Sequence, residues 1–230
     1  MALLEIACFN PESTIAAATA GADRIELCAN AAVGGTTPDT TWLAQLRGQI
    51  HVPINIMVRP RGGDFVYSDV EFQEMKESIS NYKSTGADGF VFGILLSNGR
   101  VDVDRTRELV RRAHPLPCTF HRAFDETPDL LQALEDIISC GVKTVLTSGA
   151  GRTAVDGVDL LALLTKAAER RVTIMPGGGV RSSNIGHLLS NTKAGAFHSA
   201  ALIGSEQVAS VSEIGSMKEI LASRHSLSQS

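Results

Sequence analysis

Residues 19–27 read Thr-Ala-Gly-Ala-Asp-Arg-Ile-Glu-Leu, and residues 85–92 repeat the pattern as Thr-Gly-Ala-Asp-Gly-Phe-Val-Phe. In each stretch a glycine follows a helical segment, and a β-rich run comes directly after it. Glycine is preferred just beyond the last turn of a helix, because it adopts the left-handed backbone conformation without steric cost. Gly141 and Gly195 hold the same place before two further apolar runs. The chain is therefore built from repeated helix–glycine–strand units.

Helix-start signals agree with this repeat. Asn10-Pro11 and Thr127-Pro128 each place a capping residue before a proline at the first helical position. Ser68-Asp-Val-Glu71 has the spacing of a capping box. A further helix is predicted to begin near residues 181–182.

Between these helices we expect eight strands. They fall at about residues 3–8, 23–28, 53–58, 88–93, 116–121, 143–147, 172–176 and 195–199. Strands that alternate with helices form a parallel sheet, and eight such units in 230 residues fit a (β/α)8 TIM-like barrel. An open, doubly wound sheet is the alternative, but the first strand-to-helix turn has no GxGxxG motif. We expect one barrel domain over residues 1–222 and a polar tail over residues 223–230.

The composition excludes several classes of partner. Apolar residues make up 43% of the chain, aromatic residues only 5%, and the formal net charge is −4. Without a run of Lys or Arg, neither nucleic acid nor an anionic membrane surface is an expected partner. No apolar stretch approaches the length of a membrane span, and the first residues lack the features of a secretion signal. The four cysteines are dispersed, which is typical of reduced thiols in a cytoplasmic protein.

Polar side chains gather where the predicted strands end. In a barrel of this class the ligand site lies at the carboxyl ends of the strands. Two charged clusters stand there, Arg-Pro-Arg-Gly-Gly-Asp-Phe at 59–65 and Thr-Phe-His-Arg-Ala-Phe-Asp at 119–125. We expect both clusters to share one pocket.

Four residues are candidates for acid–base catalysis: Glu5, Glu26, His121 and Asp125. A carboxylate within a buried strand is costly unless it is paired. Glu5 or Glu26 is therefore either a proton acceptor or one half of an internal salt bridge with Arg59. His121 is either a site residue or a satisfied structural imidazole.

A second group of residues is suited to binding an anion, because it offers guanidinium forks, hydroxyls and glycine N–H groups. Its members are Arg59, Arg61, Asp64, Arg122, Thr147, Ser148, Gly177, Gly178 and His198. Residues 176–180, Pro-Gly-Gly-Gly-Val, precede a predicted helix and fit a phosphate site. The alternative is a glycine-rich turn without a ligand.

Cys8 and Cys28 end adjacent predicted strands. Two thiolates at one level of a barrel suit a soft ion such as Cu(I), whereas free cysteines are more often small buried apolar residues. Cys28 shares the alternation of Glu26, but Cys8 lies three residues after Glu5. Cys8 therefore points away from Glu5 unless the strand has already ended.

At these residues the chain resembles the CutC copper homeostasis family. The matching stretches are Gly-Ala-Asp-Arg-Ile-Glu-Leu-Cys at 21–28, Gly-Gly-Thr-Thr-Pro at 34–38, the two charged clusters, Val-Leu-Thr-Ser-Gly at 145–149, Met-Pro-Gly-Gly-Gly-Val at 175–180 and Phe-His-Ser at 197–199. The resemblance covers about residues 3–200. It implies a TIM-like barrel, a cytoplasmic location, a homo-oligomer (dimer or tetramer) and a role in copper tolerance. It also implies Cys8 and Cys28 as Cu(I) ligands.

In one place the chain departs from the family pattern. Family members carry a longer segment after the last strand, whereas this chain runs from Ser199 through Ala-Ala-Leu-Ile-Gly204 toward its last helix. Two functions remain open from the sequence. One is a copper-binding homeostasis protein. The other is a TIM-barrel enzyme that acts on a small phosphorylated or carboxylated anion.

Overall fold

The computed structural model describes residues 2–204 and 207–227. Eight parallel strands form one sheet in the order β7-β6-β5-β4-β3-β2-β1-β8, and β7 and β8 lie side by side to complete a nearly closed barrel. The strands are β1 (Leu3–Cys8), β2 (Arg24–Leu27), β3 (Ile54–Met57), β4 (Gly89–Phe92), β5 (Cys118–Phe120), β6 (Thr144–Thr147), β7 (Thr173–Pro176) and β8 (Ala196–Ser199). The predicted (β/α)8 barrel is confirmed.

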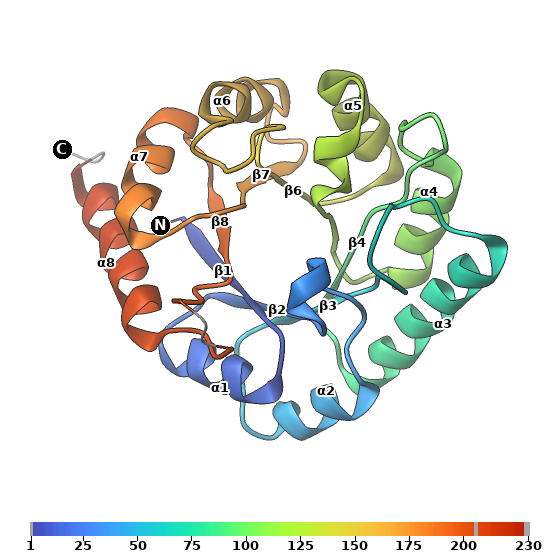
Figure 1. Cartoon of the computed structure of the whole chain (residues 1–230), viewed down its shortest axis with the longest axis horizontal. Coiled ribbons are helices and arrows are strands. Elements are labelled where there is room, and N and C mark those ends of the chain that lie inside the picture. The colour runs from blue at the N-terminus through green and yellow to red at the C-terminus, as the bar shows by residue number, and fades with distance from the viewer. Residues whose placement is uncertain (1, 205–206, 228–230) are drawn as a thin grey trace.

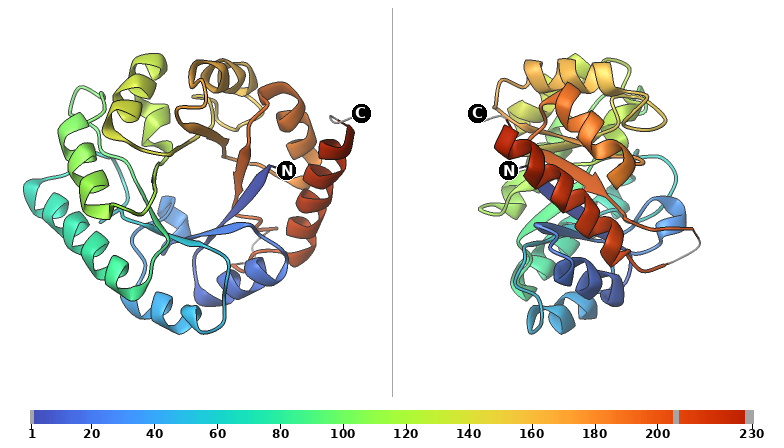
Figure 2. Two further views of the ribbon diagram at one scale, coloured as in Figure 1. Left: turned by 180° about the vertical axis from the view of Figure 1, so that it is seen from behind. Right: turned by 90° about the vertical axis from the view of Figure 1, so that its left-hand side faces the viewer.

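The described part of the chain contains eight α-helices, and they surround the strands (Figure 1). They are α1 (Pro11–Thr19), α2 (Thr40–Arg47), α3 (Asp69–Thr85), α4 (Val103–Ala113), α5 (Leu130–Cys140), α6 (Val158–Ala167), α7 (Ser182–Thr192) and α8 (Val211–Leu227). Two 3-10 helices, η1 (Ala31–Val33) and η2 (Arg122–Glu126), lie in loops that follow strands. Figure 2 shows η1 at the end of the barrel toward which the strands point.

Most of the predicted helix boundaries are confirmed. The Asn10 side chain accepts a hydrogen bond from the Ser13 N–H at 2.7 Å, and Pro11 follows it at the first helical position. Ser68 and Glu71 form the predicted capping box of α3. Gly86 and Gly141 end their helices with φ angles of 96° and 86°.

Two of the predicted boundaries are wrong. Helix α5 begins after Asp129, whose carboxylate accepts from two backbone N–H groups, so Thr127-Pro128 lies before the helix. Lys193, with φ of 56°, ends α7 in place of Gly195. Helix α8 extends to Leu227 and includes the first residues of the expected tail, 223–230, whose last three residues lie outside the described part of the chain.

Strand alternation divides the buried side chains between two regions. The large hydrophobic core lies between the strands and the helices and contains Leu4, Ile6 and Cys8. Glu5, between them, points the other way, into the lumen, because successive side chains of a strand alternate. The register then places Glu5 opposite Arg24 of β2 and His198 of β8. The fold thus brings charged groups from three adjacent strands to one level of the lumen.

Among the described helices, none has the length and apolar character needed to cross a membrane.

Candidate functional site

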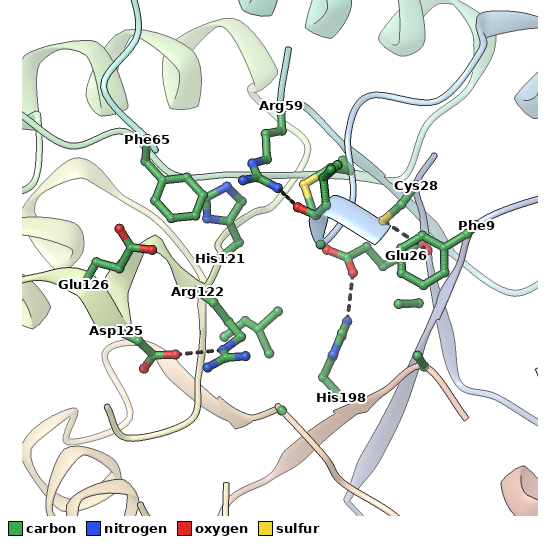
Figure 3. Close-up of a pocket in the computed structure, with 17 residues that line it drawn as sticks. Phe9, Glu26, Cys28, Arg59, Phe65, His121, Arg122, Asp125, Glu126 and His198 are labelled. Carbon is green, nitrogen blue, oxygen red and sulfur yellow. Dashed lines mark hydrogen bonds and ion pairs between the residues drawn. The ribbon is translucent and has the colours of Figure 1, made fainter. Parts of the chain in front are cut away.

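A cavity of about 410 Å³ opens at the carboxyl ends of the strands (Figure 3). This volume lies within the usual range for small-molecule sites. Its polar lining consists of Glu26, Cys28, Arg59, His121, Arg122, Asp125, Glu126 and His198, and its apolar walls include Phe9, Val33, Met57, Phe65 and Leu146. Both charged clusters of the sequence contribute to it, as expected.

Glu26 and His198 form an ion pair across the lumen. The His198 Nε2 lies 2.8 Å from Oε2 of Glu26. Burial lowers the pKa of His198, but the Glu26 carboxylate more than offsets this and raises it. For Glu26, burial raises the pKa, but the charge and the hydrogen bond of His198 reverse this effect, so the pKa is lowered. Both shifts favour the carboxylate form of Glu26 and the imidazolium form of His198. The other oxygen of Glu26, Oε1, is buried and has no hydrogen-bond partner among the described residues.

Glu5 forms the floor beneath this pair and does not line the cavity. It is fully buried and bonded to the Arg24 guanidinium, and its Oε1 lies 3.9 Å from the His198 Nε2. Burial raises the pKa of Glu5 against the opposing effect of Arg24. Of the two alternatives for Glu5 and Glu26, the salt bridge with Arg59 is not formed, because Glu5 pairs with Arg24 and Glu26 pairs with His198.

His121 is a neutral imidazole of the cavity lining, and its one N–H group has no partner among the described residues. Its Nδ1 accepts a hydrogen bond from the Ala123 N–H at 3.2 Å, which assigns the proton to Nε2. Burial, aided by Arg59, lowers the pKa of His121 to about 4. Nε2 is buried and without a partner among the described residues. The Phe65 ring, 4.9 Å from the imidazole between centroids, holds it in place.

Arg59 is also buried, and most of its hydrogen bonds go to backbone. Nη1 donates to the carbonyls of Val33 at 2.7 Å and Gly35 at 2.9 Å, and Nη2 donates to Gly63 at 2.8 Å. Its Nε is buried without a partner in the described part of the chain. The guanidinium lies 4.8 Å from the centroid of Phe65. Arg59 thus fixes two loops and leaves one N–H group free.

Asp125 is held by donors that the sequence suggested for a ligand. Its carboxylate accepts hydrogen bonds from the hydroxyls of Thr147 and Ser148, from the Ser148 N–H at 3.0 Å and from the Arg122 Nε at 2.9 Å. These donors occupy both oxygens of the Asp125 carboxylate. The structure therefore gives Asp125 a positioning role, and it leaves Thr147 and Ser148 little capacity for an external anion.

Arg61 and Asp64 lie outside the cavity. Arg61 pairs with Asp64 at 3.0 Å and with Glu71 at 2.5 Å, so its charge is already compensated. The expectation that three arginines converge on one pocket is thus met only by Arg59 and Arg122.

The glycine-rich turn after β7 serves mainly for packing. A Cβ on Gly177 would lie 2.4 Å from the Leu146 side chain, which would have to shift to admit it. Gly178 lines the cavity beside Arg122. At the start of α7 the N–H and hydroxyl of Ser182 both donate to Glu213, at 2.6 and 2.8 Å. A carboxylate of the chain itself thus caps the helix at which we expected a phosphate.

The two cysteines at the ends of β1 and β2 lie in different environments. Cys28 belongs to a small lumen cluster with Met57 and Val91, whereas Cys8 packs in the core outside the strands. Burial raises the pKa of Cys8 to about 12, and burial with Glu26 raises that of Cys28. In the described residues no group of three or more His, Cys, Asp or Glu side chains is arranged to hold a metal ion.

Several site residues were missed from the sequence. Arg24 shares the alternation of Glu26, a signal that could have placed it in the lumen, and Phe65 ends the first charged cluster. Phe9 and Glu126 lie in loops and carry no such signal.

Comparison with known proteins shows to which family the chain belongs. The model of the CutC family matches residues 2–203. The chain belongs to the CutC family. It is 45% identical to a family protein CutC from Chromobacterium violaceum over 86% of this chain and 81% of that protein. It is 42% identical to the human copper homeostasis protein cutC homolog over 86% of this chain and 73% of that protein.

Solved structures agree with this assignment. The crystal structure of CutC from Streptococcus agalactiae superimposes with a TM-score of 0.83 at 31% identity and covers 87% of this chain and 99% of that one. Phosphoribosylanthranilate isomerase from Thermotoga maritima, at 10% identity and a TM-score of 0.64 over 97% of this chain and all of that one, shares the barrel fold. The family resemblance read from the motifs is confirmed, and with it the connection to copper homeostasis that relatives carry in their names.

Proposed function

We propose that the lumen cavity is the active site of an enzyme that moves a proton at a carbon next to a carbonyl group of a small carboxylate. One observation carries this proposal. Three buried polar atoms belonging to cavity-lining residues, Glu26 Oε1, His121 Nε2 and Arg59 Nε, have no partner among the described residues. Leaving buried polar groups unpaired is costly, and a substrate that supplies the missing partners would account for all three.

Glu26 is the proposed base. Its ion pair with His198 favours the anionic form and fixes one oxygen, and the other oxygen, Oε1, is left without a partner among the described residues. A positioned carboxylate within reach of an acidic C–H is a common general base.

His121 and Arg59 are the proposed donors to the substrate oxygen. A neutral imidazole that donates through Nε2 and a guanidinium N–H are both suited to stabilise an enolate oxygen. When Glu26 removes the proton, the C–H electron pair forms a carbon–carbon double bond and the carbonyl electrons move to oxygen. Glu26 then returns a proton to carbon and is restored as the carboxylate.

Arg122 is the proposed contact for the carboxylate of the substrate. Its side chain is 43% exposed at the rim of the cavity, and its Nε and Nη2 groups are bonded to Asp125 and Ser148. Nη1 lies beside Gly178, where the missing Cβ leaves room for a ligand. Guanidinium groups bind carboxylates with a favourable charge and geometry.

Deuterium exchange tests the proposal without knowledge of the natural substrate. The protein is incubated in D₂O with a panel of small 2-oxo carboxylates, and loss of the C–H signal beside the carbonyl is followed by proton NMR. We expect catalysed exchange with at least one compound and a loss of at least about 100-fold in Glu26→Gln. Glu12→Gln, on the exterior helix α1, is the matched control and should exchange at the wild-type rate.

Exchange that is absent from the wild-type protein, or equal in Glu26→Gln, would contradict the proposal. Circular dichroism and urea unfolding of the variant establish that any loss of exchange does not reflect unfolding.

A second candidate function is the carriage of Cu(I), with copper as cargo. The observation that favours it is the lumen cluster that brings the side chains of Cys28 and Met57 together. Sulfur ligands select Cu(I), and relatives are named copper homeostasis proteins. Cys8 joins such a site only if the end of β1 rearranges, because its side chain packs outside the lumen.

Competition with a Cu(I) chelator of known affinity tests this candidate. Cys28→Ser should weaken Cu(I) binding at least tenfold, whereas Cys140→Ser, a variant of a cysteine in the outer core, should not. Wild-type affinity in a Cys8→Ser, Cys28→Ser double variant would exclude both thiols as ligands.

The family resemblance further supports a cytoplasmic homo-oligomer, a dimer or a tetramer. Sedimentation velocity of the purified chain measures the assembly, and a monomer at all concentrations would contradict it.

A further inference from the structure

A second cavity, of about 730 Å³, adjoins the lumen cavity. The loops that follow β1, β2, β3 and β8 form its walls. Phe9 and Val33 line both cavities, so a molecule that reaches Glu26 can extend past these two side chains into the second space. The second cavity therefore lies at the entrance of the proposed active site.

The wall between the cavities is firmly built. The segment 29–36 is closed by two backbone hydrogen bonds of 2.9 Å between Ala29 and Thr36. Arg59, only 5% exposed, bonds the carbonyls of Val33 and Gly35 within it. The hydrogen bonds from the buried Arg59 guanidinium to these carbonyls fix the shape of the segment. The same bonds compensate the desolvation of the guanidinium.

The second cavity has no uncompensated charge. Arg61 is the only ionisable residue of its described lining, and its guanidinium is paired with Asp64 and Glu71. The lumen cavity, by contrast, contains Glu26, Arg122 and His198. The lumen cavity therefore suits a charged group of a ligand, and the second cavity suits an uncharged one.

Neutral hydrogen-bonding groups line this second space: Asn10, Asn30, Thr36 and Gln207. Asn30 Nδ2 donates to the Thr36 hydroxyl at 2.8 Å, and Asn10 Nδ2 donates to the Gln207 carbonyl at 3.0 Å. Asn30 Oδ1 receives no hydrogen bond from the described residues, and the Thr36 hydroxyl hydrogen remains available to a ligand. Amide and hydroxyl groups of this kind offer both donors and acceptors, as hydroxyl-bearing ligands require.

We propose that this cavity is a subsite for an uncharged, hydroxyl-bearing part of the substrate, such as a sugar ring or chain. The proposal rests on the proposed function, because it assigns the reacting end of the same molecule to the lumen. The substrate class is then a carbohydrate derivative whose carbonyl and carboxylate end enters the barrel. Phe9 offers an apolar face between the two subsites.

Chemical-shift titration of the ¹⁵N-labelled protein tests the subsite directly. The probes are glucose, xylose and N-acetylglucosamine, all neutral. We expect saturable shifts of the amides in segment 29–36 and at Arg61 and Gly62 with at least one probe. Asn30→Gly removes the amide while retaining the left-handed backbone at φ of 54°, and it should weaken binding about fivefold, the equivalent of one hydrogen bond.

Asn98→Gly, in the loop between β4 and α4, is the matched control and should bind like the wild-type protein. Absence of saturable shifts with every probe, or equal affinity in Asn30→Gly, would overturn the subsite. The amide spectrum of each variant shows whether it is folded.

The same titration in Glu26→Gln separates the two proposals. Sugar binding should persist there, because Glu26 lies in the lumen and does not line the second cavity. Sugar binding without catalysed exchange in the wild-type protein leaves the subsite standing and defeats the proposed function. Catalysed exchange without sugar binding supports the proposed function and defeats the subsite.

Discussion

Replacement of Arg24 by Met removes the main partner of the most deeply buried carboxylate in the barrel. Glu5 is 0% exposed and Arg24 is 18% exposed, and they are joined by a hydrogen-bonded ion pair. Removing one half of a buried pair costs about 3–5 kcal/mol, because the other charge is left uncompensated. Glu5 retains Asn55 at 3.4 Å and His198 at 3.9 Å. We therefore expect the lower end of that range, about 3 kcal/mol of unfolding free energy at neutral pH.

Urea unfolding followed by circular dichroism measures this loss. Arg171→Met is the matched control, since Arg171 also forms an ion pair, with Glu135 at 2.7 Å, but both side chains are at least 40% exposed. That variant should lose at most about 1 kcal/mol. Adding Glu5→Gln to Arg24→Met should restore part of the stability, because it removes the uncompensated charge.

The effect should depend on pH in a defined direction. Burial already raises the pKa of Glu5 in the folded state, and loss of Arg24 raises it further. A carboxyl group of this kind contributes stability below its unfolded pKa, and this contribution is lost as pH rises through the folded pKa. The deficit of Arg24→Met should thus be smaller in mild acid than at neutral pH. A deficit at neutral pH no larger than that of Arg171→Met, or one that grows toward acid, would refute the assignment of Arg24 as the compensating charge.

Three further predictions concern the same region. His121 has a pKa of about 4 in the folded protein against the ordinary 6.5, so the unfolded state takes up the proton at the higher pH. The free energy of unfolding should therefore fall as pH decreases from about 6.5 to about 4. In His121→Phe, urea unfolding should show a smaller dependence on pH in this range. Burial raises the pKa of Cys8 and Cys28, so both thiols should react with a disulfide reagent far more slowly in the folded protein than in protein unfolded by urea. Cys8 should be the slower of the two, because it does not line the cavity. Equal rates in folded and unfolded protein would contradict this. Asp125→Asn should cost about 2 kcal/mol in unfolding free energy, because the donors around Ser148 lose a charged acceptor, and unchanged stability would contradict the positioning role.

The barrel was predictable because its signals are local. Glycines after helices and the alternation of apolar runs mark each strand to within a few residues. The parity of Cys8 relative to Glu5 also predicted that Cys8 points away from Glu5, as the structure shows for the core outside the strands.

The pairing of charges in the lumen was not predictable to the same degree. Glu5 meets Arg24 and His198 through the register of three strands, and register is a property of the assembled sheet. The start of α5 was misjudged for a local reason, because the Asp129 carboxylate caps the helix two residues after Thr127.

The structure of the site differs most from the prediction where a carboxylate of the chain accepts the hydrogen bonds that we expected a bound anion to accept. Asp125 follows Arg122 by three residues, which suggests a pair, but the hydroxyl and N–H groups that surround it come from the end of β6. Similarly, Glu213 of α8 reaches Ser182 at the start of α7. Sequence alone shows donors suited to an anion and cannot show that a carboxylate of the same chain already occupies them.

The protonation states of His121 and His198 test the central claim most directly. Nitrogen NMR of histidine-labelled protein at neutral pH reports the proton on each ring nitrogen, and His121→Phe and His198→Phe assign the signals. An anionic base and a neutral donor require His198 protonated on both nitrogens and His121 protonated on Nε2 alone. A charged His121, a proton on its Nδ1, or a neutral His198 would contradict the proposed division of roles in the lumen.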